Sequence, residues 1–468
     1  MLYFSFPMNC RTVHIKSFGC QMNKLDTALV ASALKEAGFG LAESVKQADV
    51  VLINTCSVRE HAEQRVLSHL GHLKHIKKSR PALVVGVIGC MAQRLGDKLL
   101  EHDTVDIVCG PAQIPQITGL LDEALRKQGK KLAITGEILS APDEGRTRAL
   151  EEFESVHDAD DKAIPGQAFV RVMRGCNNFC AYCIVPYVRG PEVCRPPQAI
   201  IEQVERLAGR GVKQVTLLGQ TVNAYKYKAA DRTWSLADLL ELVSRIEAIQ
   251  WIKFVTSYPA AEFFDEILHS MAGSPKVCNY LHMPAQSGSD KILRAMNRHY
   301  TAEEYLALLE KARRIVPDIS IAGDFIVGFP GETEEDFHAT VKLLKKARYK
   351  NAFIFKYSPR PGTKADKRLE DAVPAEVKQR RNAELLAVQQ KISDELSRDF
   401  LAEEVRVLVE GPSRKAKRNV DDSGRPQLVG RTEGDWIVVF NGPESLAGEF
   451  VNPRITGVSP LTLFGELA

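Results

Sequence analysis

The densest group of reactive side chains is the segment GCNNFCAYC, which brings three thiol groups into one short loop. Its cysteines are Cys176, Cys180 and Cys183, separated by three and then by two residues. A zinc site normally needs a fourth Cys or His at a short matching spacing, and the chain contains no second C-x-x-C. Iron–sulfur clusters usually have four protein ligands, so three cysteines would leave one iron able to bind another molecule. The two polar asparagines in the loop argue against three buried core thiols.

Three further cysteines each end an apolar run in the first part of the chain. The runs are RTVHIKSFGC, DVVLINTC and ALVVGVIGC, which end at Cys20, Cys56 and Cys90. Ligands of an open parallel sheet collect beyond the carboxyl ends of its strands, so these thiols could converge without a shared local motif. By spacing alone, buried strand-end thiols are the commoner interpretation. Cys109 ends a fourth such run, and we interpret it as a single buried thiol.

The elements that must position these cysteines form a multidomain α/β chain. Residues 11–130 alternate β-branched runs with helical patterns, which predicts a Rossmann-like domain around a parallel sheet. An acidic stretch with scattered Pro and Gly makes 131–161 a linker with some local structure. Residues 162–398 contain six strand-like runs separated by helical stretches and end in a long amphipathic helix after Pro374. Six repeats predict an incomplete (β/α)6 barrel of the TIM type, because a complete barrel has eight.

Residues 399–468 change to short β-rich runs, which favours a small closed all-β barrel without exposed edges, similar to an OB fold. Its first hairpin region is strongly basic, a plausible contact for a phosphate backbone. A solvated basic loop explains the same residues equally well on composition. The four cations are Arg414, Lys415, Lys417 and Arg418.

Composition excludes several classes of protein. The chain has 468 residues, a formal net charge of +3, 44% hydrophobic and 26% charged residues, as expected for a globular protein rather than a disordered one. Ten cysteines are far too few for a disulfide scaffold. The longest apolar run, Ala82 to Ala92, is shorter than the roughly 18 residues needed to cross a bilayer. The first residues do not have the pattern of a secretory signal, so we expect a cytoplasmic protein without membrane contact.

The loop C-x-x-x-C-x-x-C after the first barrel strand resembles that of the radical S-adenosylmethionine (SAM) enzymes. The whole chain is similar to their methylthiotransferase family, which combines an amino-terminal domain, a barrel and a TRAM domain. Six segments resemble the MiaB-type tRNA methylthiotransferases: FGCQMNKLD, NTCSVRE, IGCMAQR, QSGSDKILRAMNRHYT, DFIVGFPGETEEDF and YSPRPGT. The Gln-Met-Asn after Cys20 best separates this type from relatives with other targets.

The resemblance implies two 4Fe-4S clusters and SAM as cofactors. Cys176, Cys180 and Cys183 would hold the cluster that cleaves SAM, while Cys20, Cys56 and Cys90 would hold a second one that supplies sulfur. Two SAM molecules would be used per product, one as methyl donor and one as source of the 5'-deoxyadenosyl radical. The substrate would be N6-isopentenyladenosine in the anticodon stem-loop of tRNA, modified at carbon 2. That unactivated C–H bond is beyond any side-chain general base at pH 7, so no acid or base residue is expected to be catalytic.

Weaker expectations concern the cofactor face and the partners. Gly219, Gln220 and Asp324 follow or end barrel strands, where cofactor sites collect, although the glycine could simply form a turn. Tyr182 could face the adenine of SAM or merely pack in the loop. A flavodoxin or ferredoxin would donate electrons to what we expect to be a monomer. Arginines near the loop could bind phosphate or carboxylate or form ordinary salt bridges; they are Arg171, Arg174 and Arg189.

Three residues depart from the family pattern near the expected cofactor face. Cys194 stands where Ser is usual, Thr221 where Asn is usual and Tyr258 where His is common. They change side chains that we expect near the cofactor and leave the six cysteines in place.

Two alternatives remain open at this point. The same chemistry could act on threonylcarbamoyl-adenosine or on a ribosomal protein. A protein of another class, a non-catalytic iron–sulfur RNA-binding or redox-sensing protein, would carry the clusters without cleaving SAM.

Overall fold

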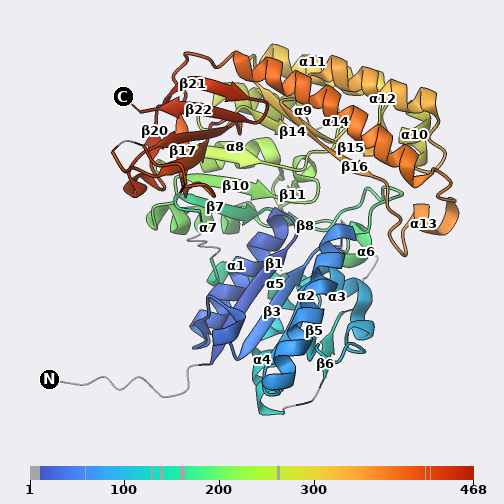
Figure 1. Ribbon diagram of the computed structural model, residues 1–468, viewed down its shortest axis with the longest axis vertical. Helices are drawn as coiled ribbons and strands as arrows, with labels where there is room; N and C mark the ends of the chain where they lie inside the picture. Colours follow the sequence, from blue (N-terminus) through green and yellow to red (C-terminus); the bar gives the residue numbers. More distant parts are fainter. Residues whose placement is uncertain are drawn as a thin grey trace. The chain divides into compact units, whose positions relative to one another are not determined.

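The computed structural model describes residues 11–57, 60–127, 129, 131–136, 141–158, 164–260, 264–416, 418–421 and 423–467. They form two compact units with interleaved chain segments. The first consists of Met1–Asp160, Arg174–Asn178 and Cys183–Val193, and the second of Asp161–Met173, Phe179–Tyr182 and Cys194–Ala468. Figure 1 labels their helices and strands.

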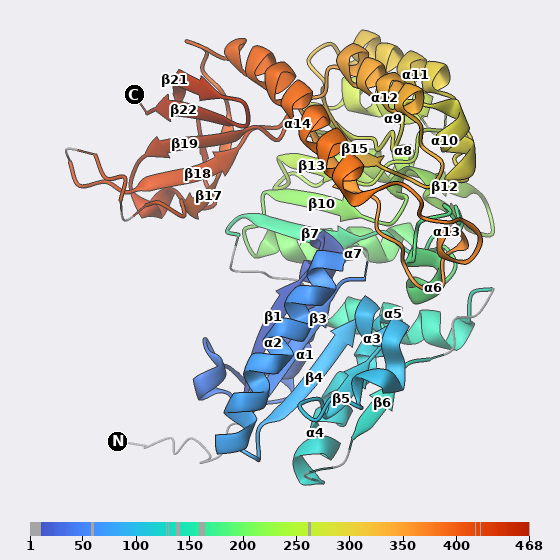
Figure 2. The same ribbon diagram turned by 45° about the vertical axis from the view of Figure 1, so that its right-hand side comes forward.

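The first unit is a parallel sheet with helices packed against it (Figure 2). Its strand order is β2-β1-β3-β4-β5-β6, and every pairing is parallel. The strands are β1 (Thr12–Phe18), β2 (Gly40–Leu41), β3 (Val50–Thr55), β4 (Val84–Gly89), β5 (Ile107–Cys109) and β6 (Leu132–Ile134). The helices are α1 (Gln21–Glu36), α2 (Glu60–Ser79), α3 (Cys90–Leu95), α4 (Ile117–Arg126), α5 (Glu144–Val156) and α6 (Val185–Arg189).

The central strands explain why this sheet is parallel and covered. All residues of β3 and β4 are buried, so both of their faces lie against other elements, as the near-continuous apolar runs VVLINT and VVGVIG require. The Rossmann-like prediction is confirmed. The stretch that we assigned to a linker contributes β6, the last strand of the sheet, and α5.

The second unit contains the predicted incomplete barrel. Two parallel sheets, β7-β10-β13 and β14-β15-β16, are joined by a parallel bridge between Ile252 and Val277. No ladder between described residues joins β16 back to β7, so the ring of six strands is open. The strands are β7 (Gln167–Arg171), β10 (Gln214–Leu218), β13 (Trp251–Phe254), β14 (Tyr280–His282), β15 (Ser320–Val327) and β16 (Asn351–Lys356).

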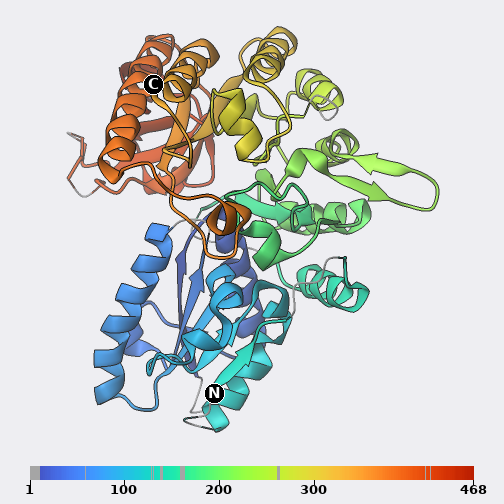
Figure 3. The same cartoon turned by 90° about the vertical axis from the view of Figure 1, so that its right-hand side faces the viewer.

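Helices follow the barrel strands along the chain and contact one another in the order α7, α8, α9, α11, α12 and α14. They bury one continuous apolar core together with the strands. The helices are α7 (Pro197–Gly209), α8 (Leu236–Ser244), α9 (Phe264–Gly273), α10 (Asp290–Ala295), α11 (Ala302–Ile315), α12 (Glu334–Ala347), α13 (Lys364–Arg368) and α14 (Ala375–Arg398). A hairpin of β11 (Lys226–Lys228) and β12 (Thr233–Ser235) projects from the barrel (Figure 3). Two short strands, β8 (Met173–Arg174) and β9 (Val193–Cys194), flank the cysteine loop in the sequence.

The carboxyl-terminal β-domain is a mixed sheet curled into a small barrel. Its order is β20-β17-β18-β19-β22-β21, and β19 runs parallel to β22. Backbone bonds from the Ala402 amide to the Ile455 carbonyl and from the Val405 amide to the Pro453 carbonyl bring the start of β21 against the segment before β17. The strands are β17 (Val407–Pro412), β18 (Gln427–Arg431), β19 (Ile437–Asn441), β20 (Phe450–Val451), β21 (Arg454–Ser459) and β22 (Thr462–Glu466).

Candidate cluster and cofactor sites

The three amino-terminal cysteines lie next to one another at one edge of the first sheet. Strands β1, β3 and β4 are neighbours, and Phe18 pairs with Thr55, which pairs with Gly89. Cys56 and Cys90 follow the last residues of β3 and β4 directly, and Cys20 lies two residues after β1. The predicted convergence at the carboxyl ends of the strands is therefore what the register produces.

Two buried asparagines, Asn23 and Asn54, connect the loops of Cys20 and Cys56 by hydrogen bonds. The Cys20 thiol donates to Asn23 Oδ1 at 3.2 Å, and Asn23 Nδ2 donates to Asn54 Oδ1 and to the carbonyl of Thr55, both at 3.0 Å. Asn54 Nδ2 donates back to the carbonyl of Asn23 at 2.8 Å. These bonds explain why FGCQMN and NTC carry amides near their cysteines, since a buried amide must be satisfied by fixed partners.

Glycines give the three loops the space that they need. A Cβ on Gly19 would lie 2.6 Å from Cys56 Cβ, so no larger residue fits between the first two loops. Gly89 has φ +93°, and a Cβ there would lie 2.5 Å from Asn54 Oδ1. The close approach of backbone at both positions requires glycine.

A buried arginine completes this group within the first unit. Arg189, the last residue of α6, donates from Nη2 to Asp26 Oδ2 at 2.9 Å and from Nε to Cys90 Sγ at 3.3 Å. The Arg189 and Asp26 side chains are 10% and 2% exposed, so this is a buried ion pair. For Arg189 the sequence left open a salt bridge or a contact with phosphate or carboxylate of a ligand. The structure shows the salt bridge, and the arginine also donates a hydrogen bond to a cysteine sulfur.

The thiols of this group respond differently to their surroundings. A hydrogen bond with Cys56, aided by the charge of Arg189, lowers the pKa of Cys20 to about 6, although partial desolvation of this thiol opposes the shift. Burial raises the pKa of Cys90, and Arg189 opposes that rise. Thiolate rather than thiol binds metal, so the guanidinium favours the ligating form of both cysteines.

The loop that contains Cys176, Cys180 and Cys183 is anchored separately in each unit. In the first unit Cys176 N donates to the carbonyl of Gly190 at 3.1 Å, and Asn177 and Glu192 exchange two bonds of 3.1 Å. The amide of Val185 donates to Cys183 Sγ at 3.5 Å. A Cβ on Gly175 would come 1.9 Å from the Pro191 carbonyl oxygen, and φ is +72° there, so the glycine before the first cysteine is required by a close backbone contact.

Cys180 belongs to the part of the loop that packs in the second unit. The neighbouring Ala181 is held by two backbone bonds, to the Met296 carbonyl at 2.8 Å and from the Ala365 amide at 2.7 Å. Arg298 Nη1 donates to Cys180 Sγ at 3.4 Å. The loop of Cys180 is therefore positioned by the segment after α10 and by α13.

The carboxyl ends of barrel strands carry polar atoms without partners. Buried Gln220 Oε1 and Ser257 Oγ, which follow β10 and β13, make no hydrogen bond to any residue that the structure describes. Buried polar atoms are nearly always satisfied, so these two fit a polar ligand at this end of the barrel. Gly219 admits no side chain, because a Cβ would lie 2.5 Å from Met173 Cγ.

Two other predicted cofactor residues have defined surroundings. Asp324 lies in β15, and its Oδ1 is 3.4 Å from Nε2 of His282. Tyr182 is half-buried and packs against the cluster of Ala181, Ile292, Met296, Phe329, Tyr357 and Ala365. Packing of Tyr182 is thus observed, and a contact with adenine stays a prediction.

The donor sets fit iron–sulfur clusters better than a single metal ion. In the described part of the chain no group of three His, Cys, Asp or Glu side chains is arranged to hold one ion. The ligands of a cluster bind different iron atoms and stand further apart. Two sets of three thiols, one of them bracketed by glycines that leave room for no side chain, suit such clusters.

Other residues singled out in the sequence also have defined surroundings. Arg174 pairs with Glu154 at 2.8 Å and with Glu151 at 3.5 Å. Cys109 is fully buried, which raises its pKa to about 12, in line with a buried thiol. Cys194 Sγ accepts from the amide of Lys226 at 3.4 Å, and Thr221 is buried.

The basic hairpin of the β-domain is exposed where the structure describes it. Arg414, Lys415 and Arg418 are exposed in the turn between β17 and β18. Lys417, the fourth predicted RNA contact, lies outside the described residues.

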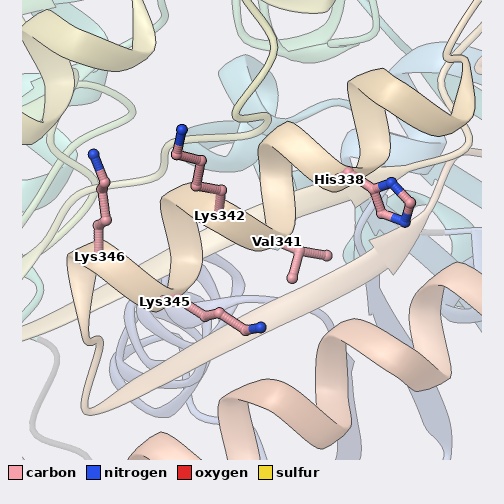
Figure 4. Close-up of a pocket in the computed structure, with 5 residues that line it drawn as sticks. All are labelled: His338, Val341, Lys342, Lys345 and Lys346. Carbon is pink, nitrogen blue, oxygen red and sulfur yellow. The ribbon is translucent and has the colours of Figure 1, made fainter.

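A hollow of about 430 Å³ on α12 is a different kind of surface (Figure 4). Its five lining residues, His338, Val341, Lys342, Lys345 and Lys346, all come from one helix. Lysines on the outer face of an amphipathic helix are ordinary solvated residues, and within the described ranges no other element lines the hollow. It is not part of the site.

Sequence reasoning missed Asn23, Asn54, Ser257 and Arg298. The two asparagines stand inside the motifs FGCQMN and NTC, so their position three residues after Cys20 and two before Cys56 was an available signal. Arg298 lies far from Cys180 in the chain, and only the fold brings them together.

Comparisons with known proteins agree with this architecture. Residues 12–110 match the Uncharacterized protein family UPF0004, residues 170–344 the Radical SAM superfamily and residues 400–468 the TRAM domain. A radical S-adenosylmethionine methyltransferase, TsrM, from Kitasatospora setae has a similar fold, with a TM-score of 0.53 and 15% identity over 76% of this chain and 77% of that one.

The fold and the cysteine loop define a radical SAM enzyme with a TRAM domain. Such an enzyme carries a 4Fe-4S cluster and SAM, and the UPF0004 region suggests a second cluster.

Relatives with higher sequence identity match this chain over nearly its full length. The tRNA-2-methylthio-N(6)-dimethylallyladenosine synthase of Rhodopirellula baltica is 43% identical over 98% of this chain and 95% of its own, and that of Porphyromonas gingivalis (strain ATCC BAA-308 / W83) is 40% identical over 98% and 95%. The chain belongs to the family of tRNA-2-methylthio-N(6)-dimethylallyladenosine synthases.

Proposed function

We propose that this chain is a transferase that attaches a methylthio group to carbon 2 of N6-isopentenyladenosine beside the anticodon of tRNA. The observation that carries the proposal is the full-length similarity to synthases of this name. The convergence of Cys20, Cys56 and Cys90 at one sheet edge supports it, because a sulfur-donating cluster needs ligands of its own.

The proposed cofactors are two 4Fe-4S clusters and two SAM molecules per product. Cys176, Cys180 and Cys183 would hold the cluster that, once reduced, would supply the electron for the cleavage of SAM, and this cleavage would supply the chemistry that removes the hydrogen from carbon 2. The second cluster, held by Cys20, Cys56 and Cys90, would supply the sulfur. The other SAM gives the methyl group.

The residues of this chain would hold and orient these groups rather than transfer protons. Asn23, Asn54 and the glycines keep the three amino-terminal cysteines in register. Gln220 and Ser257 would donate or accept hydrogen bonds to SAM at the open end of the barrel. Tyr182, Gly219 and Asp324 complete the proposed cofactor contacts.

The proposed partners are the anticodon stem-loop and a small electron donor. Arg414, Lys415, Lys417 and Arg418 would bind phosphates of the tRNA through the TRAM domain. A flavodoxin or ferredoxin would reduce the monomeric enzyme in the cytoplasm, where tRNA is found. No helix in the described ranges is long and apolar enough to cross a membrane.

The test measures nucleosides in a strain that lacks the gene. We expect the 2-methylthio mark to disappear from tRNA while isopentenyladenosine remains, and the gene, but not a Cys20→Ala/Cys56→Ala/Cys90→Ala variant, to restore it. An unchanged nucleoside profile would refute the proposal. Loss of a mark from threonylcarbamoyl-adenosine or from a ribosomal protein instead would identify the other target.

A second measurement separates the enzyme from a non-catalytic iron–sulfur protein. Anaerobically reconstituted protein should contain about eight irons per chain, four for each cluster, and release 5'-deoxyadenosine from SAM when reduced. Iron without SAM cleavage would favour the non-catalytic alternative.

A further inference from the structure

Arg298 is a buried cation with no carboxylate partner among the described residues. It is 7% exposed, and its hydrogen bonds go to neutral oxygens and one sulfur. They reach Tyr300 Oη at 2.9 Å, the carbonyl of Pro284 at 3.2 Å and Cys180 Sγ at 3.4 Å. None of the ion pairs between described residues includes Arg298. Burying an uncompensated charge costs several kcal/mol, so such a charge is retained where an anion meets it.

The other contacts of Arg298 fix its orientation without neutralising it. The guanidinium lies 4.2 Å from the centre of the Tyr258 ring and 5.0 Å from that of Tyr300. Tyr258 is itself held, since its hydroxyl accepts from the His299 amide at 3.0 Å and its amide donates to Asn223 Oδ1 at 2.8 Å. Cation–π contacts with two tyrosines leave the full positive charge in place.

Arg189 provides the contrast at the other cysteine group. It also donates to a cysteine sulfur, Cys90 Sγ, but its second contact is the buried carboxylate of Asp26 at 2.9 Å. The pair Arg189–Asp26 therefore has no net charge, whereas Arg298 adds a full positive charge beside Cys180.

We propose that Arg298 is a positioning residue that makes the SAM-cleaving cluster easier to reduce, by placing an uncompensated charge and a hydrogen bond on the ligand sulfur of Cys180. This inference rests on the proposed assignment of Cys176, Cys180 and Cys183 to that cluster. Net charge and hydrogen bonds to the sulfurs set the reduction potential of iron–sulfur clusters. Reduction adds one electron to the cluster, and a nearby cation stabilises the more negative reduced form. The cluster proposed at Cys20, Cys56 and Cys90 lies next to a neutral ion pair, so that pair stabilises its reduced form much less.

The test uses full-length protein in which one set of cysteines is removed. The Cys20→Ala/Cys56→Ala/Cys90→Ala chain should hold about four irons, all in the loop cluster. Its midpoint potential is measured by redox titration with dithionite and mediators, followed by electron paramagnetic resonance. In this background Arg298→Gln should lower the ratio of reduced to oxidised cluster about tenfold at a fixed potential, a shift of about 59 mV for one electron. Arg298→Lys, which keeps the charge, should lower it less than Arg298→Gln.

Two controls separate charge from structure. Arg381→Gln removes another buried arginine, one that pairs with Glu332 at 2.7 Å, and should leave the ratio unchanged. In the reverse background, Cys176→Ala/Cys180→Ala/Cys183→Ala, removing the neutral pair as a whole with Arg189→Gln/Asp26→Asn should move the potential of the remaining cluster less than Arg298→Gln moves the first.

The outcomes are distinguishable. If the parent triple variant holds no cluster, the proposed cysteine assignment fails. An intact cluster with an unshifted potential in Arg298→Gln overturns the role of Arg298. If Arg298→Gln loses its iron, the Arg298→Lys variant decides between the two roles. A cluster that is retained in Arg298→Lys with a potential near that of the parent supports the role of charge. Loss of the cluster in both variants means that Arg298 is only structural.

Discussion

At the scale of single residues, the candidate site depends on small side chains and amides as much as on cysteines. Gly19 and Gly89 let loops approach to distances that a methyl group would block, and Asn23 and Asn54 join those loops through the backbone. A cluster ligand is only useful when its sulfur is fixed, so these neighbours are part of the site.

Gly19→Ala should remove the second cluster selectively. The added Cβ would lie 2.6 Å from Cys56 Cβ, and neither atom can rotate away. We expect roughly half of the iron to be lost, four of about eight per chain, together with methylthiolation, while reductive cleavage of SAM persists. Iron analysis and 5'-deoxyadenosine release measure the two effects.

Gly71→Ala is the matched control. Gly71 lies inside α2, and apart from the helix backbone no atom of the described residues stands within 4 Å of the position that an added methyl group would take. Alanine favours a helix by up to about 1 kcal/mol over glycine, so full iron and activity are expected. Equal iron loss in both variants would contradict the expected clash at Gly19.

At the scale of elements, α14 carries the packing between the barrel and the end of the chain. It contacts β16, α12 and β21, and Leu385 and Ile392 enter the continuous core of the second unit. The apolar stripe of this predicted amphipathic helix, formed by Leu385, Val388, Ile392 and Leu396, packs on the barrel, and Leu396 also packs on the β-domain.

Leu385→Ala should destabilise the second unit by about 2–5 kcal/mol, because a large side chain is removed from a full core. Leu385 is completely buried. Its neighbour Leu386 is 44% exposed, and Leu386→Ala should change stability by no more than about 0.5 kcal/mol.

Tryptophan fluorescence during urea unfolding is the appropriate measurement. All three tryptophans, Trp234, Trp251 and Trp436, belong to the second unit, so the signal reports on that unit. Similar midpoints for the two variants would show that α14 does not contribute to its stability.

At the scale of the molecule, charged residues join the barrel to the β-domain inside the second unit. Lys253 Nζ lies 3.3 Å from Asp435 Oδ1, and Lys350 Nζ lies 3.7 Å from Asp435 Oδ2. Burial opposes the ionisation of Asp435, but the charges of Lys253, Lys350 and Arg431 lower its pKa to about 2. Trp251 of the barrel packs edge-on against Phe450 at 4.7 Å.

The buried amine makes stability depend on pH. Burial lowers the pKa of Lys350 to about 7, although Asp435 opposes the shift. Between about pH 7 and the ordinary lysine value of about 10.4, the unfolded chain therefore binds a proton that the folded protein lacks. The contribution of Lys350 to the free energy of unfolding rises with pH across this window and is constant below it.

Lys350→Met should remove this rise, and the difference between the two proteins should grow from about pH 7 to 10. Lys356→Met, at an exposed position at the end of β16, the strand that begins directly after Lys350, should keep the slope of the parent. Urea midpoints at several pH values give the comparison, and parallel curves for all three proteins would refute the assignment.

Much of this arrangement could be predicted because it depends on local pattern. The strand-end positions of Cys20, Cys56 and Cys90, the six barrel strands and α14 follow from apolar periodicity. What could not be predicted depends on contacts between distant segments, such as Arg298 with Cys180 or Arg189 with Asp26. A charged residue gives no sequence signal for its partner, and β6 was missed because three apolar residues are too few for a pattern.

The interleaving of chain segments limits how such a gene can be divided or recombined. Cutting after Asp160 would separate Asp26, whose side chain is 2% exposed, from the guanidinium of Arg189. Removing one partner of a buried ion pair typically costs about 3–5 kcal/mol. The amino-terminal sheet therefore cannot be transferred to another protein as residues 1–160 alone. An exchange that keeps it folded must also transfer the segment Cys183–Val193.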